Sequence, residues 1–210
     1  FQYLKSKFKP RIINANWGID IIVNSILKNK KVGIYVDVGC HHPLINNNTY
    51  LLFKRGWKGI NIDLDYSSVD MFDYFRPNDD NQKIALGDKK GLKNLYFFHN
   101  RAPKNTLNEL SGKGAKLIKK IKTDTLNNII KKSKIKIKNI DFLTIDVEGN
   151  ELDVLKGLNL KKYRPKVICL ELINKNVKFF FRSVKRPSST CMHTLLAAPV
   201  YATLCFFFLI

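Results

Sequence analysis

Acidic residues are scarce in this chain of 210 residues. Asp and Glu together number 17, against 37 Lys and Arg, so the formal net charge is +20. A surplus of this size suggests nucleic acid, an anionic membrane surface or an acidic substrate as a partner. The lysines are nevertheless spread along the whole chain, with only a modest cluster from Lys113 to Lys138. We interpret them as a solvated surface and do not expect nucleic acid as the partner.

Paired cysteines and a secretory leader are also lacking. The four cysteines are scattered without any CxxC spacing, which argues against a zinc site and against a disulfide framework. The first residues, Phe1 to Arg11, are basic and contain no apolar run. We therefore expect reduced thiols and a cytoplasmic protein.

Short apolar runs alternate with segments of helical spacing along most of the chain. The expected strands are residues 32–38, 59–63, 82–86, 92–99, 140–147 and 166–172, and the expected helices are 17–28, 48–54, 67–75, 124–132 and 151–158. Alternation of this kind builds βαβ units. The sequence therefore predicts an α/β fold: a Rossmann-like, doubly wound, mostly parallel sheet with helices on both faces.

The character of the sequence changes abruptly after Ile173. Lysine and asparagine become rarer, and Thr194 to Ile210 is almost wholly apolar. About 17 residues with Pro199 among them are at the short limit for a membrane span, so we favour a break in reading frame over a membrane anchor. We predict one domain over residues 1–173 and an atypical tail over 174–210, with the last strands of the sheet missing or replaced. Membrane contact through residues 194–210 is the alternative.

Three aspartates stand at the carboxyl ends of successive predicted strands, where open parallel sheets bind ligands. Asp37 lies just before Gly39, and its carboxylate can accept hydrogen bonds from a cationic or amine group. Asp63 stands where an acid accepts hydrogen bonds from ribose hydroxyls, and Asp88 is placed to meet an adenine amino group. Each aspartate alone is equally well explained as a helix cap, but three in register favour a binding site.

The turn after the first strand, Val36 to Pro43, lacks the GxGxxG pattern of a pyrophosphate-binding turn. This argues against NAD. A cofactor without phosphates does not need such a turn.

Several segments together resemble the FkbM-type methyltransferases. They occur in the family's order and spacing over about residues 16–172, and they are residues 36–43, 48–63, 85–88, 105–106, 140–149, 151–157 and 163–168. The resemblance implies S-adenosylmethionine as cofactor and O-methylation of a hydroxyl on a sugar, glycan or secondary metabolite. We therefore expect a small-molecule or glycan acceptor.

The resemblance also implies roles for individual residues. Its cofactor contacts are Asp37 and Gly39 at the methionine end, Asp63 at the ribose and Asp88 at the adenine, with Leu64 and Leu86 as further contacts. Asp146 and Glu148 are implied at the mouth of the pocket, near the methyl group.

A hydroxyl acceptor needs a base to take its proton, and Asp146, Glu148, His41 and His42 are the candidates. Either histidine can instead serve only to bond the backbone of its loop. Asp146 and Glu148 could also bind a divalent ion. Two clustered acids are few ligands, so we expect no metal site.

Two other functions remain open at this point. One is an RNA-modifying methyltransferase whose lysines contact phosphates, although no motif of stacking aromatics supports it. The other is a truncated, non-catalytic domain tethered to a membrane by its apolar tail.

Overall fold

The structure is a computed structural model, and it describes residues 14–15, 18–100, 102, 104–172, 195–197 and 204–209. For residues 171–172, 195–197 and 204–209 the description is limited to the backbone. Trp17, with which the first helix was expected to begin, lies outside the described residues.

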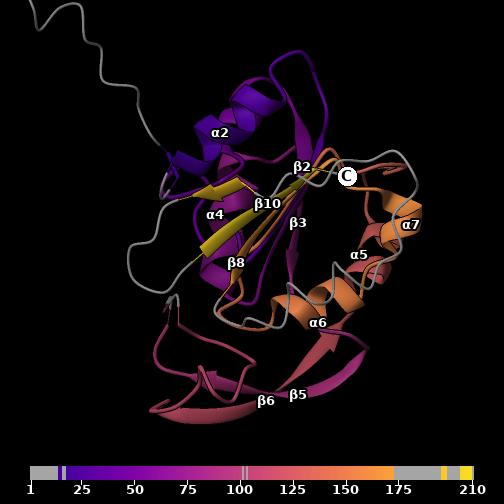
Figure 1. Cartoon of the computed structure of the whole chain (residues 1–210). Coiled ribbons are helices and arrows are strands. Elements are labelled where there is room, and N and C mark those ends of the chain that lie inside the picture. Colours follow the sequence, from indigo (N-terminus) through magenta and orange to yellow (C-terminus); the bar gives the residue numbers. More distant parts are fainter. Residues whose placement is uncertain are drawn as a thin grey trace, which may run out of the picture.

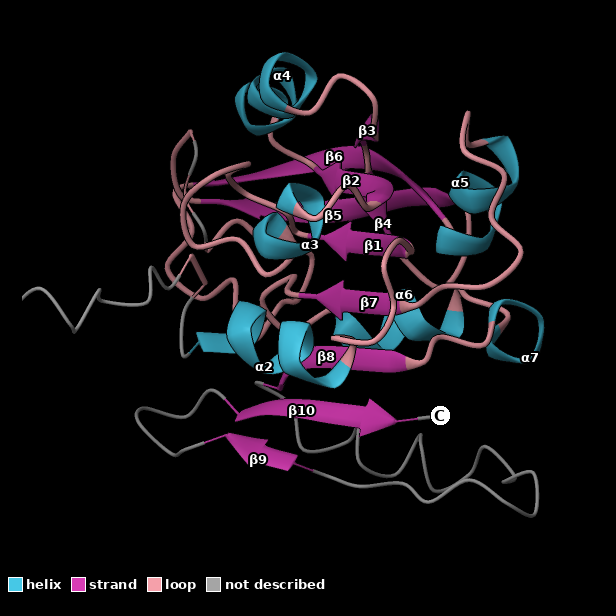
Figure 2. Ribbon diagram, turned by 90° about the horizontal axis from the view of Figure 1, so that it is seen from above, coloured by secondary structure: helices cyan, strands magenta, loops and turns pink. Residues whose placement is uncertain are grey.

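Seven of the described strands form one sheet in the order β3-β2-β1-β7-β8-β10-β9. Five of them run parallel: β3 (Asp80–Lys83), β2 (Lys58–Asp63), β1 (Ile34–Val38), β7 (Phe142–Ile145) and β8 (Val167–Leu172). Figure 2 shows the strands from β1 to β9 side by side, with β10 pointing the opposite way. The predicted α/β fold with a mostly parallel sheet is confirmed.

Each face of this sheet is covered by helices. Residues alternate along β1, so Tyr35 joins a core with α2 and α3, whereas Val36 and Val38 join a second core with α5, α6 and α7. The helices are α2 (Ile19–Ile26), α3 (Tyr50–Lys54), α4 (Tyr66–Phe75), α5 (Leu126–Lys132), α6 (Glu151–Lys156) and α7 (Leu160–Tyr163). Helix α4 packs beside β2 and β3.

A second, three-stranded sheet, which we call the accessory sheet, lies next to α6 at the bottom of Figure 1. Its strands are β4 (Ala85–Leu86), β6 (Leu117–Asp124) and β5 (Gly91–Phe97), in the order β4-β6-β5. Strand β6 was not predicted. Its first residues are exposed and rich in lysine, so they carry no alternation of apolar and polar side chains.

The predicted strand 82–86 is wrong in its extent, because the structure divides it between the two sheets. Residues 80–83 form β3 beside β2, and residues 85–86 form β4 beside β6. The amide of Ile84, between them, donates to the carbonyl of Asp63. The chain thus passes from the main sheet to the accessory sheet just where Asp63 ends β2.

The tail supplies two strands at the far edge of the main sheet. Of the two expected outcomes, missing strands are excluded, because β10 (Leu204–Leu209) pairs antiparallel with β8, and β9 (Leu195–Ala197) pairs with β10. Replacement of the last strands by an atypical tail stays a prediction. The apolar, aromatic composition that suggested a membrane anchor also suits a strand. Residues 173–194 lie outside the described part, so the division of the chain at residue 173 stays a prediction. Within the described residues, no helix has the length and apolar character to cross a bilayer.

The ends of β1 and β7 approach each other so closely that only glycine fits between them. Gly39 has a φ of +79°, in the left-handed region, and its amide donates to the carbonyl of Ile62 over 2.8 Å. A Cβ atom on Gly39 would lie 1.8 Å from the carbonyl oxygen of Asp146. The absence of a side chain here lets three strands end at one place.

We expect Gly39→Ala to destabilise the protein by about 3 kcal/mol, because backbone strain adds to overpacking against the carbonyl of Asp146. Gly56→Ala is the matched control. Gly56 has a similar φ of +83°, but a Cβ atom there meets nothing within 4 Å. This control should lose only about 1 kcal/mol from strain alone. Urea denaturation of both variants measures the difference, and equal losses would show that the contact with Asp146 costs nothing.

Candidate functional site

A cavity of about 270 Å³ opens at the carboxyl ends of β1, β2, β4 and β7. This is the edge at which parallel sheets bind ligands. Eight of the ten candidate site residues line it: Asp37, Gly39, His41, Asp63, Leu64, Leu86, Asp146 and Glu148. The sheet thus brings together residues that are more than a hundred positions apart in the sequence.

The charge of the cavity is opposite to that of the chain. Five carboxylates line it, those of Asp37, Asp63, Asp65, Asp146 and Glu148, and no described Lys or Arg is among its lining residues. In a chain with 37 basic and 17 acidic residues, this is a strong local reversal. The cavity is therefore suited to a ligand that carries positive charge.

Asp63 holds two loops of the cavity in place. Its Oδ2 accepts a hydrogen bond of 2.9 Å from the amide of His41, and its Oδ1 accepts one of 2.8 Å from the amide of Asp65. Burial raises the pKa of Asp63 above its ordinary value, although these two amides oppose the shift. Asp63 is thus a structural carboxylate as well as a lining residue.

Asp37 is buried at the floor of the cavity. Both hydrogen bonds that we find on its carboxylate go to Oδ2, from Asn47 Nδ2 at 3.0 Å and from Thr49 Oγ1 at 2.9 Å. Burial raises the pKa of Asp37 to about 6, while the hydrogen bond from Thr49 and the positive charge of Arg76 lower it. Asp37 therefore changes charge close to neutral pH.

Three residues of the cavity that are not glycine have left-handed backbones. These are His41, with a φ of 51°, Asn46, with a φ of 50°, and Glu148, with a φ of 54°. The amide of His41 is held by Asp63, and the carbonyl of Glu148 accepts a hydrogen bond of 2.8 Å from Thr106 Oγ1. Such conformations are uncommon for these residues and gather at functional sites.

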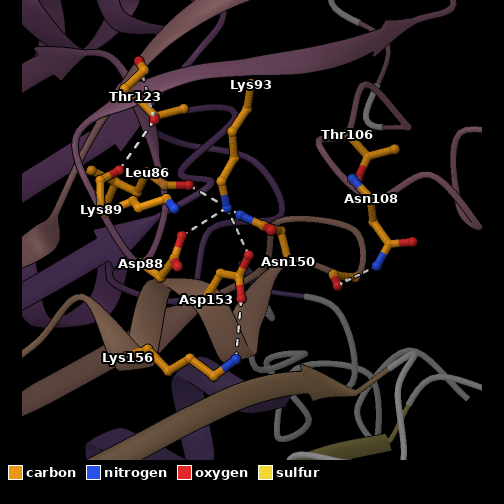
Figure 3. A network of polar contacts seen from close by, with 12 residues as sticks. Leu86, Asp88, Lys89, Lys93, Thr106, Asn108, Thr123, Asn150, Asp153 and Lys156 are labelled. Atoms are coloured by element: carbon orange, nitrogen blue, oxygen red, sulfur yellow. Dashed lines mark hydrogen bonds and ion pairs between the residues drawn. The ribbon is translucent and has the colours of Figure 1, made fainter.

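Asp88 is the one predicted cofactor contact that does not line the cavity. Figure 3 shows it beside Lys93 of the accessory sheet, whose Nζ lies 3.0 Å from Asp88 and 2.7 Å from Asp153 on α6. Asp88 thus helps to fasten the accessory sheet to α6. Its predicted contact with adenine has no support from this position.

Asn48 and Asn150 line the cavity, although the sequence did not single them out as part of a site. Asn105 and Thr106, which belong to the segments that resemble the family and lie in the loop between β5 and β6, line it as well. The sequence does contain a run of asparagines, Asn46 to Asn48, after the first strand. Asparagines in such a position are also typical of a turn, so the run alone does not indicate a binding site.

His42 bonds its own loop: its Nδ1 accepts the amides of Leu44 and Ile45, each at 3.1 Å. It does not line the cavity, so His41 is the histidine placed at the site. Among the described residues, no group of three or more His, Cys, Asp or Glu is arranged to hold a metal ion.

Residues 37–188 match the family described as the methyltransferase FkbM domain. No curated protein matches the chain. The matched residues include the ends of all four strands that line the cavity, and they make up most of the chain. The chain therefore belongs to the FkbM methyltransferase family.

Proposed function

We propose that this protein transfers a methyl group from S-adenosylmethionine to a hydroxyl of a sugar, glycan or secondary metabolite. The observation that carries the proposal is the carboxylate-lined cavity without described Lys or Arg side chains in a chain of net charge +20. S-adenosylmethionine has a cationic sulfonium and a cationic ammonium, and it lacks phosphates. Its charge complements the cavity, whereas a dinucleotide would bring negative charge to five carboxylates.

The strand ends suggest how the cofactor lies. We assign Asp63 to the ribose hydroxyls and the apolar side chains of Leu64 and Leu86, which line the same cavity, to the adenine. Asp37 and Gly39 lie at the end of β1, where a carboxylate and a bare backbone suit the ammonium and carboxylate of the methionine part. When bound, the cofactor supplies an electrophilic methyl group for direct displacement.

The residues at the mouth of the cavity are suited to the acceptor. Asp146 is exposed and Glu148 is half-buried, both after β7, and His41 follows β1. Each can take the proton that a hydroxyl loses when it is methylated. The side chains of Asn48, Asn105 and Thr106 offer the hydrogen-bond donors and acceptors that a hydroxyl-rich acceptor needs.

We infer a cytoplasmic site of action. In the part of the chain that the structure describes, Cys40 is a free and buried cysteine. This agrees with a compartment that keeps thiols reduced.

We expect Asp63→Asn to weaken the binding of S-adenosylmethionine at least about tenfold, because hydrogen bonds to a charged acceptor contribute about 1.5–3 kcal/mol each. Asp88→Asn is the matched control, since Asp88 stands at the next strand end but outside the cavity. We expect its affinity to stay within about twofold of wild type. Isothermal calorimetry measures both, with thermal melts to verify folding.

Two results would contradict this assignment. Unchanged affinity in Asp63→Asn would remove Asp63 from the ribose role. A large loss in Asp88→Asn would restore the adenine contact implied for Asp88 by the family resemblance. Absence of binding by the wild type would overturn the proposed function itself.

One observation favours a second candidate function, methylation of RNA. Residues 89–122, which include β5 and β6, contain nine lysines and one arginine but a single acid, Glu109. We place this function second because the aromatic residues of the accessory sheet are not free for base stacking. The ring of Phe97 lies under Lys119 Nζ at 4.4 Å, and Gly112 packs against the ring of Tyr96.

We expect single-stranded RNA to bind only in the non-specific range, with Kd of about 10⁻⁴–10⁻⁶ M at physiological salt. A salt titration of affinity, with wild type and with a variant in which Lys119, Lys120 and Lys122 are all alanine, tests this. Three phosphate contacts would give a slope of about −2 in log–log form, or a loss of about 16-fold between 50 and 200 mM salt. RNA would be favoured as the acceptor if wild type binds it more tightly than this range with such a slope, and if the triple variant loses that binding.

A further inference from the structure

Arg76 is a fully buried cation below the floor of the cavity. It is the first residue after α4, and its side chain has no solvent exposure. The guanidinium lies 4.8 Å from the ring of Phe53 and 5.0 Å from the ring of Phe72. Among the described residues, no carboxylate lies within ion-pair distance of it. A buried charge without a direct counter-ion is costly, so its retention calls for an explanation.

Two polar partners of Arg76 also hydrogen-bond Asp37. Nη1 donates to Thr49 Oγ1 over 2.9 Å, and Nη2 donates to Asn47 Oδ1 over 2.8 Å and to the carbonyl of Pro43. Thr49 and Asn47 both donate to Asp37 Oδ2. Arg76 and Asp37 are therefore joined by two bridges, each one side chain long, and the bridging oxygens Thr49 Oγ1 and Asn47 Oδ1 lie 2.8 Å apart.

Arg76 has a weaker contact on another side. Its Nη1 lies 3.5 Å from the hydroxyl of Tyr35, which donates to Asp79 Oδ2.

The direction of these bridges follows from the chemistry of arginine. A guanidinium has five N–H donors and no acceptor. The oxygens of Thr49 and Asn47 must therefore accept from it. The hydroxyl hydrogen of Thr49 has two acceptors within reach, Asp37 Oδ2 at 2.9 Å and Asn47 Oδ1 at 2.8 Å, and the carboxylate is the stronger acceptor. The amide of Asn47 is also held by the amide of Thr49, which donates to its Oδ1 over 3.0 Å, and by the carbonyl of Cys40, so the hydroxyl of Thr49 is the group that loses its orientation without Arg76.

We propose that Arg76 is a positioning residue for cofactor binding, acting through Thr49 and Asn47 to orient the carboxylate of Asp37 and to keep it ionised for the cationic part of the ligand. This rests on the proposed function, because it assigns Asp37 to the cofactor. Both bridges end on Oδ2, so Oδ1 is the oxygen that the ligand would use.

The charges around Asp37 give the sign of the expected effect. Arg76 faces it from the end of α4, Asp63 from the end of β2, and the buried thiol of Cys40 from the loop after β1. Burial and the charge of Asp63 raise the pKa of Asp37, whereas the charge of Arg76 and the two bridging hydrogen bonds lower it. Removal of a bridge must therefore raise that pKa further, so that Asp37 becomes protonated at a higher pH.

The decisive experiment follows two readouts between pH 5 and pH 9: calorimetric affinity for S-adenosylmethionine, and titration of the Asp37 carboxyl carbon by NMR in the protein without ligand. The variants are Arg76→Gln, which removes the charge, and Thr49→Val, which removes one bridge and keeps the charge. Thr49→Ser retains the hydroxyl and is the rescue control. Circular dichroism verifies that each variant is folded.

For wild type we expect affinity to fall as the pH drops through about 6, the pKa of Asp37. In Thr49→Val and more so in Arg76→Gln, this fall should move to higher pH, with a loss of affinity of about fivefold or more at pH 7 that recovers at pH 9. Thr49→Ser should follow wild type. In an Asp37→Asn background, Thr49→Val should have no further effect on the pH profile.

The two readouts separate the failure of this inference from the failure of the proposed function. If wild type binds the cofactor but folded Thr49→Val and Arg76→Gln have the wild-type pH profile and carboxyl titration, Arg76 is only structural and the inference is wrong. If Arg76→Gln does not fold, Thr49→Val alone decides it in the same way. If wild type binds no S-adenosylmethionine at any pH, the proposed function fails. The assignment of Arg76 to cofactor binding then fails with it. This holds even if the NMR titration still shows that Arg76 lowers the pKa of Asp37.

Discussion

The carboxyl ends of β1 and β7 meet with no room for a side chain between them, and the geometry of the site depends on this contact. Gly39 takes a left-handed turn directly against the carbonyl of Asp146, while its amide bonds the carbonyl of Ile62 at the end of β2. Three strands therefore end at the same level. The residues that follow them diverge from one small region, and the cavity is the space that they leave.

Several acids in one cavity repel one another, and their burial disfavours the charged form. The fold offsets this with donors that come from the chain itself. Asp63 receives two backbone amides, and Asp37 receives two side chains that are in turn oriented by Arg76. Within the described residues, no Lys or Arg side chain lines the cavity, so the field of the lining is suited to a cation. A ligand with a sulfonium and an ammonium would relieve the repulsion that these donors only reduce.

The sequence was informative wherever a buried strand ends in an acid or a glycine. Apolar runs identified the central strands, and eight of the ten candidate site residues lie together around the cavity. Asp88 lies outside the cavity lining, and its position past a short strand in the sequence gives no sign of the ion pair with Lys93. Strand β6 was missed because its exposed lysines hide the period of a strand. Arg76 was missed because a single arginine after a helix looks like surface, and only the tertiary structure buries it.

The accessory sheet and the main sheet are connected through the turn that follows β7. Thr106 bonds the carbonyl of Glu148, and Asn108 bonds the carbonyl of Gly149 over 2.8 Å, so the loop between β5 and β6 is docked on this turn. Lys93 fastens the same sheet to α6, which begins two residues after Gly149. The wall lined by Asn105 and Thr106 and the two acids Asp146 and Glu148 are thus set by one short segment. A change in the length or sequence of the loop would alter this wall of the cavity without disturbing the ends of β1 and β2, where Asp37 and Asp63 lie.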